Sequence, residues 1–276
     1  MTVESLIESS LTDLVSLLTK NGTCGNLIFP HYRDYSVRYS EQELRQLFLK
    51  NVETNDNKTY FYSVETPTKL VYRFTNTEIP KVKDPNNVDD NDKDNYKSAR
   101  FDVSLYNKPY KNNDKASNHI EFKYGNPDQK NAICKDFLKL ISEVDLTKEK
   151  RNFFVHYHYV KEDKGESASL QKIFKKYCES INNIEKSFKN EKNHEKREAL
   201  LKNLSQNLPK ITVYFLYIHD KVKKILTYHF SLDALKNYTD GTKYNDFGDK
   251  TYLNEEVFKF GEEIHFKEIK TVIREN

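Results

Sequence analysis

The sequence predicts an α/β protein in which a mixed sheet is flanked by helices. Between residues 59 and 160, several short segments alternate apolar and polar or aromatic and β-branched residues, a pattern typical of strands. Other segments place apolar residues three and four positions apart, as amphipathic helices do. Because these helical segments precede, interrupt and follow the strands, we expect helices to cover the sheet.

Composition narrows the class of protein further. The chain has 276 residues, 45 basic and 42 acidic, and its net charge of +3 excludes neither nucleic acid nor a neutral partner. No segment approaches the ~20 apolar residues of a membrane span, and the N-terminus carries acids where a signal peptide needs bases. We therefore expect a cytoplasmic protein. Cys24, Cys134 and Cys178 are widely spaced, which favours reduced thiols over a disulfide framework or structural zinc.

The first 160 residues are expected to form the core. A helix at 3–20 is followed by a second helix that starts at Ser40. Residues 59–65 and 69–74 flank a Thr-Pro-Thr segment and predict a hairpin, whereas residues 81–97 contain almost nothing apolar and predict a solvated or disordered loop. The remaining expected elements are strands at 98–106, 118–124 and 152–160 and a helix at 129–143.

Residues 161–276 are expected to extend the same domain with further helices and strands. Their charged amphipathic segments predict helices, and alternating segments predict strands. The expected elements are helices at 167–188 and 193–207, a hairpin of strands at 209–218 and 223–230, a loop with a short helix at 231–250, and mainly β structure at 257–273.

Three charged residues share one face of two neighbouring predicted strands. Asp102 lies in the first strand, and Glu121 and Lys123 lie two positions apart in the second. Because side chains alternate between the faces of a strand, adjacent pairing brings two carboxylates and one ammonium together. The opposite face is expected to carry Phe101, Val103 and Leu105 from the first strand and Ile120, Phe122 and Tyr124 from the second.

This set of groups suits phosphodiester hydrolysis. Two converging carboxylates bind a hard cation such as Mg²⁺ or Mn²⁺ through oxygen, and the backbone carbonyl of Phe122 is a candidate third ligand. The metal polarises a phosphoryl oxygen and lowers the pKa of bound water. Lys123 can orient that water, stabilise negative charge, or act as a base if its pKa is depressed.

Two acids at the start of the second helix are further candidates. With Ser40 as the N-cap, Glu43 occupies the third helical position and completes a capping box. Glu41 either leans toward the sheet as an additional metal ligand or serves the helix dipole in the first turn. The sequence leaves both readings of Glu41 open.

The order of these motifs resembles the PD-(D/E)xK restriction-endonuclease-like superfamily over residues 40–160. Asp102 followed by Glu121-Phe122-Lys123 carries the resemblance, although Phe101 stands where the family motif has proline. The resemblance implies a mixed central sheet flanked by helices, metal ligation by Asp102 and Glu121, and a role for Lys123 at the attacking water. It also implies a nuclease acting on nucleic acid, chiefly DNA, and the wider pattern is similar to bacterial restriction or defence proteins.

Other interpretations stay open. An isolated E-x-K is common on half-exposed strands, so the same fold can be a catalytically inactive module that binds nucleic acid or protein. Asp102 and Glu121 can also be unrelated surface acids. His156 and His158 share a strand face, but no third ligand at a useful spacing accompanies them, which favours aromatic packing over a metal site. A homodimer or a partner protein remains open as well.

Overall fold

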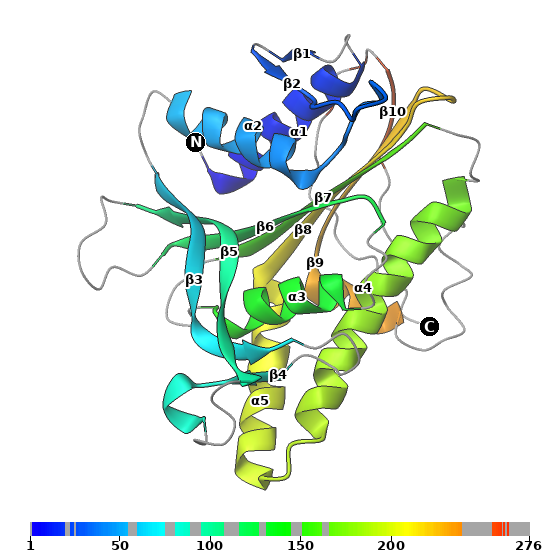
Figure 1. Cartoon of the computed structure of the whole chain (residues 1–276). Helices are drawn as coiled ribbons and strands as arrows, with labels where there is room; N and C mark the ends of the chain where they lie inside the picture. The colour runs from blue at the N-terminus through cyan, green and yellow to red at the C-terminus, as the bar shows by residue number, and fades with distance from the viewer. Residues whose placement is uncertain are drawn as a thin grey trace.

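The described residues form an eight-stranded mixed sheet with helices on both of its faces (Figure 1). The structure is a computed structural model that describes residues 2–19, 23–24, 26–54, 60–74, 81–88, 95–107, 116–126, 131–144, 151–161, 166–238, 256–260, 262 and 264. The helices are α1 (Val3–Thr19), α2 (Glu41–Thr54), α3 (Ala132–Ser142), α4 (Glu166–Lys189) and α5 (His194–Asn207), with 3₁₀ turns η1 (Pro85–Asn87), η3 (Leu208–Lys210) and η4 (Leu232–Tyr238).

The strands of the large sheet follow the order β10-β9-β8-β7-β6-β5-β3-β4. Their bounds are β3 (Phe61–Arg73), β4 (Lys81–Lys83), β5 (Lys97–Tyr106), β6 (Asn118–Tyr124), β7 (Asn152–Val160), β8 (Ile211–His219), β9 (Lys224–Ser231) and β10 (Glu256–Lys259), and a separate pair is formed by β1 (Thr23–Cys24) and β2 (Leu27–Ile28). Strands β6, β7 and β8 are parallel and all other neighbours are antiparallel. Parallel neighbours need a crossover, which α3 supplies between β6 and β7, and α4 with α5 between β7 and β8.

Two apolar cores lie on the two faces of the sheet. Helices α1 and α2 cover one face, where Leu47 and Phe48 pack in the same cluster as Ile120 and Phe122 of β6. Helices α3, α4 and α5 cover the other face, where Phe137 is one of many aromatic and aliphatic side chains. The sheet is therefore the middle layer of three (Figure 1).

Most predicted elements are confirmed with small shifts of their ends. The expected strand at 118–124 coincides with β6, and the helix expected at 129–143 is α3, although residues 129 and 130 lie outside the described part. The hairpin expected at 209–230 is formed by β8 and β9. Of the β structure expected at 257–273, the structure describes β10, and residues 265–276 lie outside the described part.

The hairpin expected at 59–74 is wrong, because residues 61–73 of this segment form the single strand β3. Its pairing with β5 runs from Phe61 to Pro67 and resumes at Val71, so residues 68, 69 and 70 face only Ala99. Proline has no N–H to donate, which suits it to such a bulge. The hydroxyl of Thr68 accepts from the backbone N–H of Ala99 at 2.9 Å. A side chain thus replaces the missing backbone acceptor, and the strand continues instead of turning.

The loop expected at 81–97 is also corrected in part. Residues 81–83 form β4, which pairs with the end of β3 at Tyr72↔Val82. Val82 packs against the core beneath α3 and α4, and the ammonium of Lys83 lies 4.8 Å from the centre of the buried Tyr96 ring. Residues 89–94 lie outside the described part.

Two further expectations concern the thiols and membranes. Cys134 and Cys178 are buried free thiols, and burial raises the pKa of each to about 12. The side chain of Cys24 lies outside the described part.

Among the described helices, none combines the length and apolarity needed to cross a bilayer.

Candidate functional site

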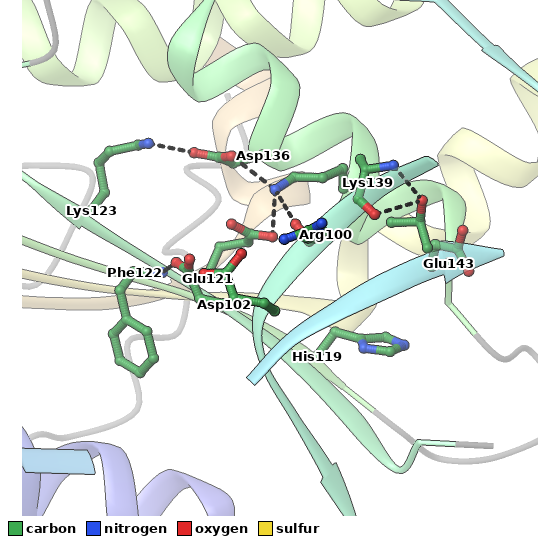
Figure 2. A network of polar contacts seen from close by, with 12 residues as sticks. Arg100, Asp102, His119, Glu121, Phe122, Lys123, Asp136, Lys139 and Glu143 are labelled. Carbon is green, nitrogen blue, oxygen red and sulfur yellow. Dashed lines mark hydrogen bonds and ion pairs between the residues drawn. The ribbon is translucent and has the colours of Figure 1, made fainter. Parts of the chain in front are cut away.

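Two neighbouring strands separate where the candidate residues lie. The antiparallel ladder between β5 and β6 ends at the pair Val103↔Ile120, just before Asp102 and Glu121 would face each other. Here the backbone N–H of Phe122 donates to Oδ2 of Asp102 at 2.7 Å. The Asp102 side chain thus takes the place of a backbone acceptor, and the strands part around it (Figure 2).

Glu121 and Lys123 project from β6 toward helix α3 (Figure 2). The ammonium of Lys139 lies 2.6 Å from Oε1 of Glu121 and 3.2 Å from Oδ1 of Asp136. The other oxygen of Asp136 lies 2.7 Å from the ammonium of Lys123. Lys139 also donates to the carbonyl of Arg100 at 2.9 Å. Opposite charges therefore alternate along a buried charge network that consists of Glu121, Lys139, Asp136 and Lys123.

Sequence reasoning did not predict Asp136 and Lys139 as part of the site. Both side chains are buried, although both residues are charged. A signal was present in the helix that follows the E-x-K strand, because Asp136 and Lys139 lie within residues 136–141, whose other four members are all apolar. Charged residues are rarely buried unless they are paired. The position of these two residues among apolar neighbours therefore predicts that each has an oppositely charged partner.

A cationic side chain of helix α2 also lies near Asp102. One guanidinium nitrogen of Arg45 lies 3.9 Å from Oδ1 of Asp102 and 2.9 Å from Oε1 of Glu65. Arg45 belongs to the layer on the opposite side of the sheet from Lys139. Asp102 therefore lies at the gap between β5 and β6 with a cation on either side.

Burial and neighbouring charges shift the pKa values in different directions. Burial raises the pKa of Asp102, and it raises the pKa of Glu121 well above its ordinary value of 4.5 even though Lys139 opposes the shift. Burial acts the same way on Asp136, but Lys139 and Lys123 outweigh it and hold the pKa of Asp136 below 3.8. Glu121 is therefore the carboxyl of the network that takes up a proton most readily.

The two lysines remain protonated. Burial lowers the pKa of a lysine, but the carboxylates of Asp136 and Glu121 more than offset this at Lys139. At Lys123 the same balance, again dominated by Asp136 on the favourable side, leaves the pKa above its ordinary value. Both side chains thus act as ammonium groups at neutral pH.

The side-chain orientations that alternation predicts are correct for β6 but only in part for β5. Ile120 and Phe122 lie in the core under α1 and α2, opposite to Glu121 and Lys123. Phe101 was expected to face the same way as Val103, but it packs in the core under α3 and α4. Its ring stacks on His119 at 4.0 Å between centroids. We attribute the change of face to the separation of the strands, since β5 is released from β6 at Asp102.

The two acids of α2 have different surroundings. The carboxylate of Glu43 accepts from the backbone N–H of Ser40 at 3.1 Å and from its hydroxyl at 2.8 Å, which confirms the capping role. Glu41, in the first turn, is close enough to help raise the pKa of Lys123. Glu41 therefore borders the network, whereas Glu43 is committed to the helix end.

His156 and His158 lie in β7 beside β6. Nε2 of His156 is 2.6 Å from the carbonyl of Gly125, and Nδ1 contacts the hydroxyl of Tyr177. Burial lowers the pKa of His156 to about 3 and that of His158 to about 4. Both rings are therefore neutral, and His156 serves as a buried link between β7, α4 and the turn after β6.

The described residues contain no group of three His, Cys, Asp or Glu side chains placed to hold a metal ion. Asp102 and Glu121 offer two carboxylates, and Glu121 is only 3% exposed, which is contrary to the reading of both as surface acids. The fold and the site together define a mixed α/β protein with a buried cluster of carboxylates and ammonium groups. The cluster lies where strands β5 and β6 separate. No protein-family model, no curated protein and no solved structure matches the chain.

Proposed function

We propose that the protein is a divalent-metal-dependent nuclease with a restriction-endonuclease-like core, acting on DNA in preference to RNA. One observation carries the proposal: adjacent strands bring the carboxylates of Asp102 and Glu121 to the gap between β5 and β6. The two are near enough that the charge of Asp102 raises the pKa of Glu121. Lys123 follows on the same face of β6. The preference for DNA rests on the resemblance of the motif alone.

The donor set fits a hard cation such as Mg²⁺ or Mn²⁺. Mg²⁺ is commonly held by one or two carboxylates, with waters and substrate phosphate completing the shell, so Asp102 and Glu121 suffice. The N–H of Phe122 points toward Asp102, and the N–H and C=O of one strand residue point to the same edge. The Phe122 carbonyl is thereby directed toward the same gap, and Glu41 at its border is a further candidate ligand.

The bound cation would polarise the scissile phosphate and lower the pKa of a coordinated water. Lys123 would assist as a cation, because its pKa is raised and it stays protonated. Its ammonium can hold the attacking water by hydrogen bonding and stabilise the negative charge that develops on the phosphate. This favours the orienting and charge-stabilising roles of Lys123 over that of a general base.

Lys139 would neutralise Glu121 while no metal is bound and would compete with the cation for it. Its ammonium neutralises Glu121 at 2.6 Å, while Asp136 lies 3.2 Å away on the same helix. When a divalent cation takes over the neutralisation of Glu121, Lys139 still has Asp136 as a partner. The network can therefore accept the metal without leaving a buried ammonium unpaired, which would be costly.

Cleavage assays test this proposal directly. Purified protein is incubated with Mg²⁺ or Mn²⁺ and with single-stranded, duplex and circular DNA and with RNA. We expect cleavage of at least one DNA form, and loss of it by roughly 10² or more in Glu121→Gln, as for removal of a group that stabilises the transition state. Glu179→Gln is the matched control, because Glu179 is an exposed acid of α4, and it should cleave normally.

One observation favours a second function, that of an inactive module which binds nucleic acid or protein. Glu121 and Asp136 already have ammonium partners, and Asp102 has Arg45 nearby. A self-neutralised network needs no metal to be stable. If no substrate is cleaved and Mn²⁺ binding is the same in the wild type and Glu121→Gln, this second function replaces the first.

A further inference from the structure

A short hairpin between β2 and α2 displays two tyrosine rings to solvent. Tyr35 is 88% exposed and Tyr32 is 56% exposed. The two arms of this hairpin are joined by a β-bridge between His31 and Val37. We call residues 31–38 the tyrosine hairpin. Exposure of one ring is ordinary, but two rings three positions apart at one tip form a concentrated aromatic surface.

The tip of the tyrosine hairpin has a defined conformation. The N–H of Tyr32 donates to the carbonyl of Ser36 at 2.8 Å, and the N–H of Tyr35 donates to the carbonyl of Tyr32 at 3.0 Å. Oδ1 of Asp34 accepts from both the N–H and the hydroxyl of Ser36. Tyr35 itself has a φ of 63°, which is uncommon for a residue with a side chain. The turn thus holds its rings outward at some conformational cost.

The base of the tyrosine hairpin is fixed to the core. Phe29 is buried, and its ring lies 4.9 Å from that of Tyr39. Tyr39 in turn packs 5.0 Å from Tyr159 of β7. The hydroxyl of Tyr157 donates to the carbonyl of Ser40 at 2.7 Å. The exposed rings are therefore presented from a rigid base, which reduces the entropy lost when a ligand binds.

The same base borders the candidate active site. Tyr39 lies 6.2 Å from Tyr124, which directly follows Lys123 in β6. Burial, with Tyr39 and Tyr32 nearby, raises the pKa of Tyr124 to about 12. The chain then passes from Tyr39 through Ser40 into α2. The base of the hairpin therefore lies at the end of β6 that carries Lys123, but on the face of the sheet opposite to the Lys123 side chain. A single strand bound to the hairpin would reach the candidate site by passing around that end of the sheet.

The charges around the rings favour a polyanion. Arg33 and Arg38 are exposed on the tyrosine hairpin, and the ammonium of Lys161 lies 5.1 Å from the centre of the Tyr39 ring. The single acid, Asp34, is occupied inside the turn by Ser36, and these hydrogen bonds lower its pKa. Exposed aromatic rings between cationic side chains are the arrangement on which single-stranded nucleic acid binds, with bases stacked and phosphates neutralised.

We propose that the tyrosine hairpin is a binding site for single-stranded nucleic acid, where Tyr32 and Tyr35 stack on bases and Arg33 and Arg38 contact phosphates. Duplex bases are already stacked on each other and offer no free face to these rings. The inference rests on the proposed nuclease function and deepens it, since it names single strands or single-stranded ends as the substrate.

Binding and cleavage are measured separately, so that the two proposals can fail independently. Fluorescence anisotropy with a labelled oligo(dT) in EDTA reports binding without metal-dependent chemistry. We expect Tyr32→Ala/Tyr35→Ala to weaken binding by roughly ten-fold or more, the effect of losing base stacking. Tyr32→Phe/Tyr35→Phe keeps both rings and should bind within about two-fold of the wild type. Tyr62→Ala removes an exposed tyrosine of β3 and serves as the control.

Several results would overturn the assignment of the tyrosine hairpin. One is no measurable binding by the wild type, and another is tighter binding of a duplex than of the single strand. The others are unchanged affinity in the double alanine variant, or a loss of affinity in the double phenylalanine variant as large as that in the double alanine variant. If the double alanine variant binds normally while Glu121→Gln alone abolishes cleavage, the nuclease proposal stands without the hairpin. If the wild type binds single strands through both rings but cleaves nothing, the hairpin stands and the nuclease proposal fails.

Discussion

The ammonium of Lys139 lies 2.6 Å from a carboxylate oxygen of Glu121, and the two side chains are only 9% and 4% exposed. Removing both partners of an ion pair from water is costly, and this cost is offset only where further hydrogen bonds satisfy the two groups. Lys139 meets this requirement through Asp136 and through the carbonyl of Arg100. The pair fastens helix α3 to strand β6 and sets the charge of the candidate site.

Replacing Lys139 by methionine should strongly destabilise the protein. Glu121 would keep its burial but lose its cation, and removal of one partner of a buried pair costs about 3–5 kcal/mol. Urea denaturation at pH 7 measures the change. Lys175→Met, an exposed lysine of α4, should cost less than about 1 kcal/mol. A loss of similar size in both variants would contradict the structural role of Lys139.

The stability of Glu121→Gln relative to the wild type should depend on pH. The pKa of Glu121 is raised in the folded state, so the folded protein binds this proton more readily than the unfolded chain. That contribution to stability is complete below pH 4.5 and is lost as the pH rises through the raised pKa. Glutamine does not titrate, so the variant should gain stability relative to the wild type from pH 4 to pH 8. A constant difference in the free energy of unfolding would contradict this.

Thr68→Val should destabilise the bulge of β3. The Thr68 hydroxyl accepts from the N–H of Ala99 at 2.9 Å, and an unsatisfied buried N–H costs about 1–3 kcal/mol. Thr68→Ser keeps the hydroxyl and should cost much less. Urea denaturation of both variants decides the matter, and equal losses would show that the hydroxyl has no such role.

The fold was predictable where local pattern decides it. The spacing of apolar residues gave α1, α4 and α5, and alternation gave β6 and β7. The bulge in β3 was not predictable, because a Thr-Pro-Thr segment suits a turn and a bulge equally well. The choice depended on pairing with Ala99, some 30 residues further along the chain.

The candidate site was predictable in part for the same reason. Alternation placed Glu121 and Lys123 on one face of β6, and the structure has them there. Alternation failed at Phe101, since the separation of the two strands is a tertiary feature that a single strand does not encode. Asp136 and Lys139 were missed because Lys123 and Glu121, which pair with them from β6, lie on another element of the fold.

Competition between Lys139 and a divalent cation follows from the proposed function. Lys139 neutralises Glu121 in the structure, so a metal must replace its charge. Lys139→Met should therefore bind Mn²⁺ more tightly than the wild type, by roughly ten-fold, which corresponds to ~1.4 kcal/mol. Isothermal titration measures both affinities at a temperature where the variant is folded, and Lys175→Met is the control. Weaker binding by Lys139→Met would show that Lys139 supports the metal site and does not compete for it.

A crystal soaked in MnCl₂ and measured for anomalous scattering tests the central claim most directly. The account predicts a manganese peak between Asp102 and Glu121, with carboxylate oxygens at roughly 2.0–2.6 Å from the ion as for hard divalent cations, and a longer distance between Lys139 and Glu121. No peak at this position in saturating Mn²⁺ together with an oligonucleotide, with Lys139 still paired to Glu121, would contradict it.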